Sequence, residues 1–115
     1  MQQLTTIEEL DNLIQTQPGL VVLFGGAHCG VCNVIKPKLA QALAEDFAQL
    51  MLVYVDCQVT TDICSQKGVF SLPVVQVYID GQRFIEKTRN FSLPGLLADL
   101  SRPYSMRFET DVNEN

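Results

Sequence analysis

The chain has 115 residues, of which 47% are hydrophobic and 18% charged, and its formal net charge is −5. This length fits one globular domain, and the composition is too hydrophobic for a disordered chain. The negative charge argues against nucleic-acid binding, and no hydrophobic run approaches the roughly 20 residues of a membrane-spanning helix. Residues 1–19 lack the basic start of a secretory signal, so we expect a cytoplasmic protein, where structural disulfides are rare.

Two helices and a buried strand are predicted in the first half of the chain. Thr6 and Glu9 form a capping-box pattern before an amphipathic stretch, which predicts a helix over residues 6–16. Residues 20–24 are continuously hydrophobic, as is typical of a strand that is buried on both faces. A long helix is expected over residues 30–49, because hydrophobic residues there recur at helical spacing.

The second half of the chain alternates further strands with short helical segments. Asp80-Gly81 is a strong hairpin signal, so the strands on either side of it should pair antiparallel. Ser92 is expected to cap a final helix. The other predicted elements are a strand over 51–55, a helix over 60–67, and strands over 74–79 and 83–88.

The order α-β-α-β-α-β-β-α predicts an α/β fold, with a central mixed sheet flanked by helices on both faces. We expect residues 1–101 to form this domain. Residues 102–115 are polar and acidic, and we expect them to form a C-terminal tail. A homodimer formed through this tail is a possibility that the sequence leaves open.

The motif Cys29-Gly30-Val31-Cys32 lies between the first buried strand and the long helix. Free backbone N–H groups and the helix dipole stabilise an anion there, so they lower a thiol pKa from ~8.5 toward ~7. A cysteine one turn later can resolve a mixed disulfide, which favours thiol–disulfide exchange. The alternative is a zinc or iron–sulfur site. Zinc needs four ligands, and the other candidates are His28, Cys57 and Cys64, so we expect no metal.

Several motifs in register resemble the thioredoxin family over about residues 4–101. The two-cysteine motif is similar to the family's Cys-Gly-Pro-Cys, and Pro37 matches a proline five residues later. Gly68-Val69-Phe70-Ser71-Leu72-Pro73 is similar to the segment that ends in the family's cis-proline. Asp80-Gly81 matches its hairpin turn. The resemblance implies a thioredoxin-like fold.

The resemblance also implies roles for single residues. Cys29 is the nucleophile and Cys32 is the resolving thiol, and their disulfide is the redox group, with no further cofactor. Pro73 is the cis-proline that faces the dithiol, and the Leu72 backbone pairs with an extended substrate. The implied substrate-binding positions are His28, Gly30, Val31, Leu72, Pro73 and Arg89.

Six positions depart from the family pattern, and one of them is Val31, which replaces the proline between the two cysteines. Leu23 stands where thioredoxins usually carry a buried Asp, and Leu52 stands where they usually carry its Lys partner. That acid is expected to move protons to and from the resolving cysteine. His28 and Gly25 replace two tryptophans, and Arg89 replaces a glycine. These changes predict a divergent substrate face.

Cys57 and Cys64 are seven positions apart and flank the predicted short helix. The favoured interpretation is two small buried hydrophobic residues. A second, regulatory disulfide is the other interpretation, and it needs Cα atoms within ~7 Å, which the spacing does not show.

We therefore predict an enzyme that reduces protein disulfides through the Cys29/Cys32 dithiol and a mixed-disulfide intermediate. Its partners would be disulfide-containing client proteins and a recycling reductase or the glutathione system. The alternative is a thioredoxin-fold adaptor or redox sensor with one specific protein partner. The departures at Leu23, Leu52 and Arg89 and the lost tryptophans are the features that favour this alternative.

Overall fold

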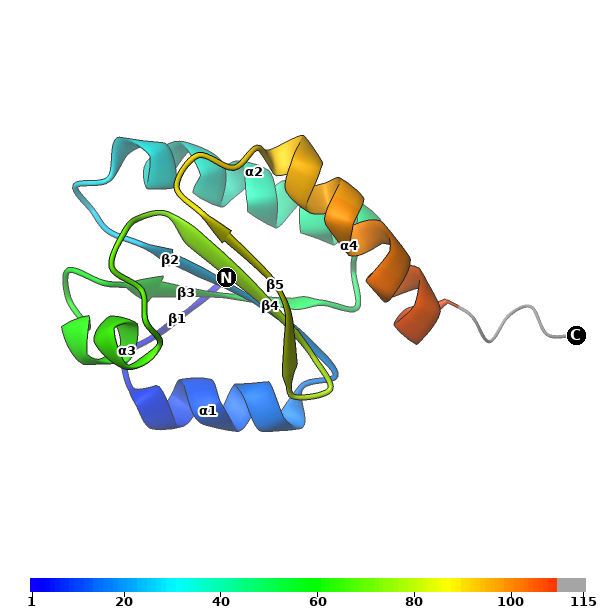
Figure 1. Cartoon of the computed structure of the whole chain (residues 1–115), viewed down its shortest axis with the longest axis horizontal. Helices are drawn as coiled ribbons and strands as arrows, with labels where there is room; N and C mark the ends of the chain where they lie inside the picture. Colours follow the sequence, from blue (N-terminus) through cyan, green and yellow to red (C-terminus); the bar gives the residue numbers. More distant parts are fainter. Residues whose placement is uncertain (110–115) are drawn as a thin grey trace, which may run out of the picture.

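A five-stranded mixed sheet lies at the centre of this computed structural model, which describes residues 1–109 (Figure 1). The strand order is β1-β3-β2-β4-β5. Strands β1 and β2 run parallel to β3, whereas β4 runs antiparallel to β2 and β5 antiparallel to β4. The strands are β1 (Gln2–Leu4), β2 (Gly19–Gly25), β3 (Met51–Asp56), β4 (Val74–Ile79) and β5 (Gln82–Thr88).

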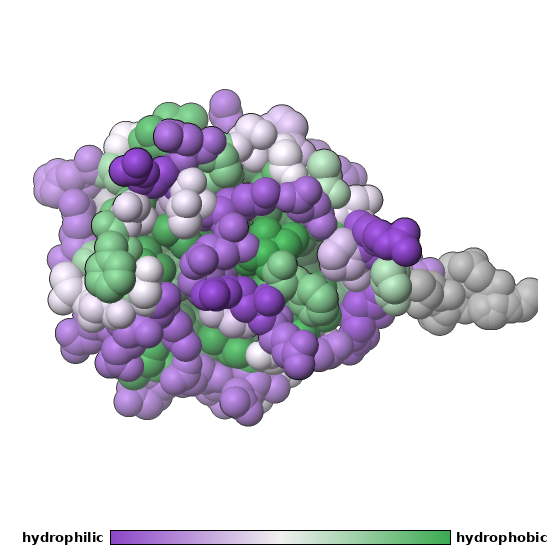
Figure 2. All heavy atoms as spheres, viewed as in Figure 1, coloured by the Kyte–Doolittle hydropathy of each residue, from purple (hydrophilic) through white to green (hydrophobic). Residues whose placement is uncertain are grey.

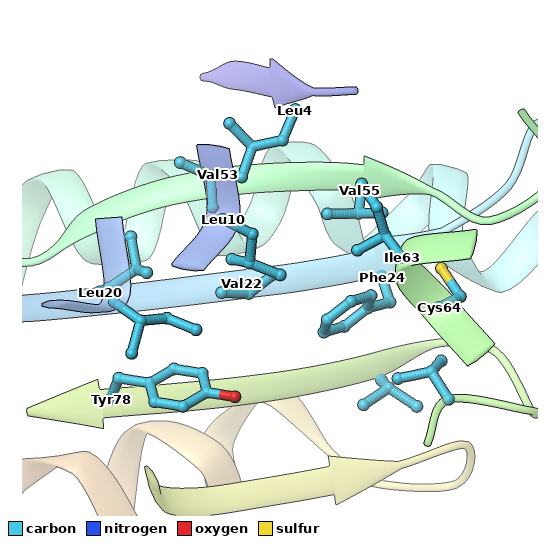
Figure 3. Packing of buried hydrophobic residues seen from close by; sticks show 13 residues of the cluster. Leu4, Leu10, Leu20, Val22, Phe24, Val53, Val55, Ile63, Cys64 and Tyr78 are labelled. Atoms are coloured by element: carbon cyan, nitrogen blue, oxygen red, sulfur yellow. The ribbon is translucent and has the colours of Figure 1, made fainter. Parts of the chain in front are cut away.

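Helices cover both faces of the sheet, which confirms the predicted fold class (Figure 1). The helices α1 (Ile7–Thr16) and α3 (Thr61–Gln66) pack on one face, and α2 (Gly30–Asp46) and α4 (Leu93–Phe108) pack on the other. Figure 3 shows the core under α1 and α3, where side chains from the strands meet those of the two helices. The central strand β2 is buried along its whole length, because both of its faces are covered.

Local signals begin and end the elements where the sequence predicts. The Thr6 side chain accepts a hydrogen bond from the Glu9 backbone N–H, and the Glu9 side chain completes the capping box of α1. Ser92 caps α4 by accepting a bond from the Gly95 N–H at 3.0 Å. Asp80 and Gly81 both have positive φ, as the tight turn between β4 and β5 requires.

The structure differs from the sequence predictions at the two ends of the described chain. The short edge strand β1 was not predicted, and it pairs with β3 through residues 2–4. At the other end, α4 continues past residue 101 to Phe108. Tyr104 is buried against Phe47, and its hydroxyl accepts a hydrogen bond from the Gln49 N–H at 3.1 Å. Residues 102–109 therefore belong largely to the folded domain, and residues 110–115 of the expected tail lie outside the described residues.

The described helices were compared with the requirements for a membrane-spanning helix. Within residues 1–109, no helix combines the length and the hydrophobicity that a crossing of the bilayer requires.

Candidate active site

The two cysteines of the motif occupy the junction between β2 and α2. Cys29 is the N-cap of α2, and its Sγ accepts a hydrogen bond from the Cys32 backbone N–H at 3.2 Å. The two residues form a disulfide with a Cα–Cα distance of 5.2 Å. Cys29 is half-buried, whereas Cys32 is only 1% exposed. An incoming reagent can therefore reach the first sulfur more easily than the second.

This placement explains the reactivity expected of Cys29. A residue at an N-cap faces backbone N–H groups that have no partner within the helix, and these groups stabilise a negative charge. The contact from the Cys32 N–H is one such interaction, made to the sulfur itself. When the disulfide is reduced, the same N–H favours the Cys29 thiolate over the thiol.

Hydrogen bonds fix the loop that carries the dithiol. The His28 N–H donates to the Gln58 Oε1 at 3.0 Å, and the Cys57 N–H donates to the Gly25 carbonyl at 2.8 Å. The Asn33 side-chain amide, from α2, donates to the Ala27 carbonyl at 3.2 Å. The His28 residue itself is exposed. The loop is thus attached to the segment that follows β3.

The segment before β4 reaches the same end of the sheet. Val74 pairs with Phe24 of β2, which places Pro73 beside the strand end from which the dithiol loop leaves. The Leu72–Pro73 peptide bond is cis, as the family resemblance implies. The Pro73 carbonyl accepts a hydrogen bond from the Arg89 N–H at 2.8 Å. These contacts bring Leu72, Pro73 and Arg89 to the edge where the dithiol lies.

Arg89 has a φ of 52°, a left-handed conformation that glycine adopts most easily. This backbone geometry accounts for the glycine that the family usually carries at the position. Here the arginine side chain is exposed. A positively charged residue is therefore hydrogen-bonded through its backbone to the cis-proline.

The two family positions that became leucine are accommodated without an unpaired charge. Leu23 is completely buried and lies opposite Tyr54 in the register of β2 and β3. Leu52 is partly buried at the edge of the same core. Burial raises the pKa of Tyr54, and the Asp56 carboxylate raises it further. Tyr54 is a polar neighbour of the site that the sequence interpretation missed, because it belongs to a hydrophobic strand.

Cys57 and Cys64 form a second disulfide, with a Cα–Cα distance of 5.7 Å. The interpretation of these residues as two unpaired hydrophobic side chains is therefore wrong. Cys57 follows β3 directly, and the turn at Asp56 brings α3 back over it, with the Thr60 N–H donating to the Asp56 carbonyl. Cys64 packs into the core under α3, as Figure 3 shows. The turn and the helix, rather than the spacing, bring the two sulfurs together.

Large hydrophobic side chains are exposed on segments that border the site. Val31 and Val34 lie in the first turns of α2, and Phe70, which precedes the cis-proline, is 83% exposed. Figure 2 shows one face of the molecule, on which hydrophobic patches lie between hydrophilic residues. Exposed hydrophobic side chains near a reactive group are typical of a protein-binding surface.

Metal binding was the alternative chemistry for the cysteines. Residues 1–109 contain no cluster of three or more His, Cys, Asp or Glu side chains that could hold a metal ion. Within the same residues all four cysteines are paired as disulfides.

The fold and the disulfide at the start of α2 define a thiol–disulfide oxidoreductase. Comparison with known proteins identifies the family, because the thioredoxin family model matches residues 2–101. The chain therefore belongs to the thioredoxin family, and it is a protein disulfide oxidoreductase. The adaptor interpretation is not favoured.

Individual relatives agree with this assignment. The chain is 32% identical over 82 residues to thioredoxin of Mycoplasmoides gallisepticum, covering 71% of this chain and 81% of the relative. It is 24% identical over 106 residues to the thioredoxin-like protein YdfQ of Bacillus subtilis, covering 92% and 94%. Among solved structures, oxidised mitochondrial thioredoxin 3 of Saccharomyces cerevisiae has a TM-score of 0.78 at 24% identity, covering 90% of this chain and 94% of that one.

Proposed function

We propose that this protein reduces disulfides of other proteins. The observation that carries the proposal is the asymmetry of the dithiol: Cys29 is half-buried at a helix N-cap, and Cys32 is buried behind it. The Cys29 thiolate attacks one sulfur of the client disulfide, and the other client sulfur leaves as a thiolate. Cys32 then attacks the Cys29 sulfur, which forms the Cys29–Cys32 disulfide and releases the second client sulfur. Two electrons pass from the dithiol to the client.

The residues around the dithiol would bind an extended segment of the client. The exposed Gly30 and Val31 offer backbone and apolar contacts on one side of Cys29, and the Leu72 backbone lies next to Pro73. His28 would contact the client next to the attacked sulfur. Arg89 carries a positive charge near Pro73 and favours clients with acidic residues beside the disulfide.

Recycling of the oxidised protein completes the cycle. Thioredoxins act on disulfide substrates and are reduced again by a reductase. We infer the same route here, with a reductase or the glutathione system as the electron donor and the Cys29–Cys32 disulfide as the redox group. We propose that the protein acts in the cytoplasm, in electron transport and cell redox homeostasis. A homodimer formed through residues 102–115 stays a prediction, and the solution mass of the full chain tests it, because a monomeric mass would exclude the dimer.

An insulin-reduction assay driven by dithiothreitol tests the proposal. The wild-type protein should accelerate the reaction, and Cys29→Ser should abolish the acceleration, because no thiolate remains to start the exchange. The matched control is Cys57→Ala/Cys64→Ala, which removes the sulfur atoms of the other disulfide and should keep the activity. No acceleration by the reduced wild-type protein at neutral pH would overturn the proposal.

Trapping experiments separate a general reductase from an adaptor. Cys32→Ser removes the resolving thiol, so mixed disulfides with clients should accumulate on Cys29. Several trapped clients with different sequences support the reductase. A single non-covalent partner that still binds Cys29→Ser would instead support the adaptor.

A further inference from the structure

The absence of a side chain at Gly25 leaves a small space between β3 and the start of α2. A Cβ atom placed at Gly25 would lie 3.0 Å from the Tyr54 Oη and 3.1 Å from the Cys32 Cβ. The hydroxyl and the Cys32 Cβ therefore flank one point, and they are at most about 6 Å apart, the sum of these two distances. The Cys32 Sγ is bonded to this Cβ, so the hydroxyl lies in the immediate neighbourhood of the sulfur, where one water can join the two groups.

The surroundings of Tyr54 are otherwise poor in polar groups. Leu23 on β2 lies opposite Tyr54 in the register, and Val75 on β4 lies on the other side of Leu23. The charged groups that face Tyr54 are Lys36 from α2, whose Nζ lies 3.8 Å from the ring centroid, and Asp56 from β3. Within residues 1–109 every buried side-chain nitrogen and oxygen has a hydrogen-bond partner, so the Tyr54 hydroxyl, which has no protein partner there, keeps contact with solvent.

The protonation state of Tyr54 suits a donor. Burial and the Asp56 carboxylate both raise its pKa, so the hydroxyl stays protonated at neutral pH. Only 5% of the residue is exposed, and the Lys36 Nζ lies over the face of its ring. The hydroxyl is thus held near the resolving cysteine with its proton available.

We propose that the Tyr54 hydroxyl stabilises the Cys32 thiolate in the resolving step. It would take the place of the acid that the family usually carries at the position of Leu23. The inference rests on the proposed function, because it assigns a role within the same dithiol exchange.

The step balances without a further reagent. In the mixed disulfide, Cys32 loses its thiol proton to solvent, and the Tyr54 O–H donates a hydrogen bond to the resulting thiolate without losing its own proton. The Cys32 sulfur then forms a bond to the Cys29 sulfur. The bond between Cys29 and the client breaks, and the client sulfur leaves with the electron pair. The tyrosine is unchanged at the end.

The test measures the pKa of Cys32 alone. In a Cys29→Ser background, the alkylation rate of Cys32 by iodoacetamide is followed against pH by peptide mass spectrometry. Adding Tyr54→Phe should raise the Cys32 pKa by about one unit, a tenfold loss of thiolate below the pKa. With Cys29 present, Tyr54→Phe should slow the resolution of a mixed disulfide by about the same factor at neutral pH.

The matched control is Tyr78→Phe, which removes the hydroxyl of a buried tyrosine on the opposite face and should leave the Cys32 pKa unchanged. Gly25→Ala is a second variant. It keeps the hydroxyl but places a methyl group between it and Cys32, so it should raise the pKa in the same direction. An unchanged Cys32 pKa in a folded Tyr54→Phe or Gly25→Ala variant would overturn the inference. The alkylation needs no turnover, so its outcome is independent of the insulin assay.

Discussion

The two disulfides of this protein lie in different surroundings. Cys29–Cys32 spans the first turn of a 17-residue helix, with one sulfur half-buried and a backbone N–H donating to it. Cys57–Cys64 joins the end of β3 to a six-residue helix, and Cys64 packs into the core beside hydrophobic residues such as Ile63 and Val69. A thiolate is stabilised at the first position, whereas hydrophobic burial disfavours it at the second. We therefore expect the same kind of bond to serve exchange in one place and stability in the other.

The largest expected difference is in stability. Cys57→Ala/Cys64→Ala should lower the free energy of unfolding of the oxidised protein by about 2–3 kcal/mol, because it removes a constraint on the unfolded chain. Urea unfolding of the variant and of the wild type under oxidising conditions measures this difference. A decrease in unfolding free energy below about 0.5 kcal/mol would contradict a structural role for the second disulfide.

The second-largest expected difference is in how easily the two disulfides are reduced. In redox buffers, the equilibrium constant for reduction of Cys29–Cys32 should be at least tenfold larger than that for Cys57–Cys64. This ratio separates the two reduction potentials by about 30 mV. Differential alkylation of the four cysteines followed by mass spectrometry measures both midpoints. Coinciding midpoints would make the second pair a further exchange site, as a regulatory disulfide requires.

Gln58 links the two regions and gives a smaller effect. It follows Cys57 directly, and its side-chain oxygen accepts the His28 N–H next to Cys29. Gln58→Ala should cost about 1 kcal/mol of unfolding free energy and leave the second disulfide intact. Replacing the nearby exposed Val59 with Ala is the matched control and should cost less. Equal losses of unfolding free energy in the two variants would show that the hydrogen bond between the His28 N–H and Gln58 does not contribute to stability.

The smallest effect should come from pH. Tyr54 lies in the core next to the first disulfide and Tyr78 in the core next to the second, and burial raises the pKa of both above 10.0. A raised pKa in the folded state stabilises the fold fully below about pH 10, and this contribution is lost as the pH rises through the folded value. The unfolding free energy should therefore fall above pH 10, and less so in Tyr78→Phe. Urea titrations at pH 8 to 11 test this.

The sequence predicted the helices, four of the strands and the dithiol junction because each carries a local signal. Hydrophobic runs mark β2 and β4, and Asp80-Gly81 marks the turn between β4 and β5. The strand β1 has one hydrophobic residue in three, so it carries no periodicity, and only its partner β3 defines it. The cis bond at Pro73 followed from the family resemblance, since X–Pro bonds are mostly trans.

Other features depend on distant contacts that local patterns do not contain. The Cys57–Cys64 bond needs α3 to fold back over the end of β3, which a spacing of seven residues does not determine. The proximity of Tyr54 to Cys32 depends on the missing side chain at Gly25. The end of α4 did carry a signal that the polar composition obscured, because hydrophobic residues recur every four positions at Leu96, Leu100, Tyr104 and Phe108.

That last helix affects how the protein can be engineered. The match to the family ends at residue 101, but a fragment cut there would lose Tyr104 and Phe108 and uncover Phe47 and Leu50. It would also lose the salt bridge between Arg107 and Asp80, which connects the final turn of α4 to the hairpin. A tag or fusion partner at the C-terminus should therefore begin after residue 109, so that the shielding of this core is preserved.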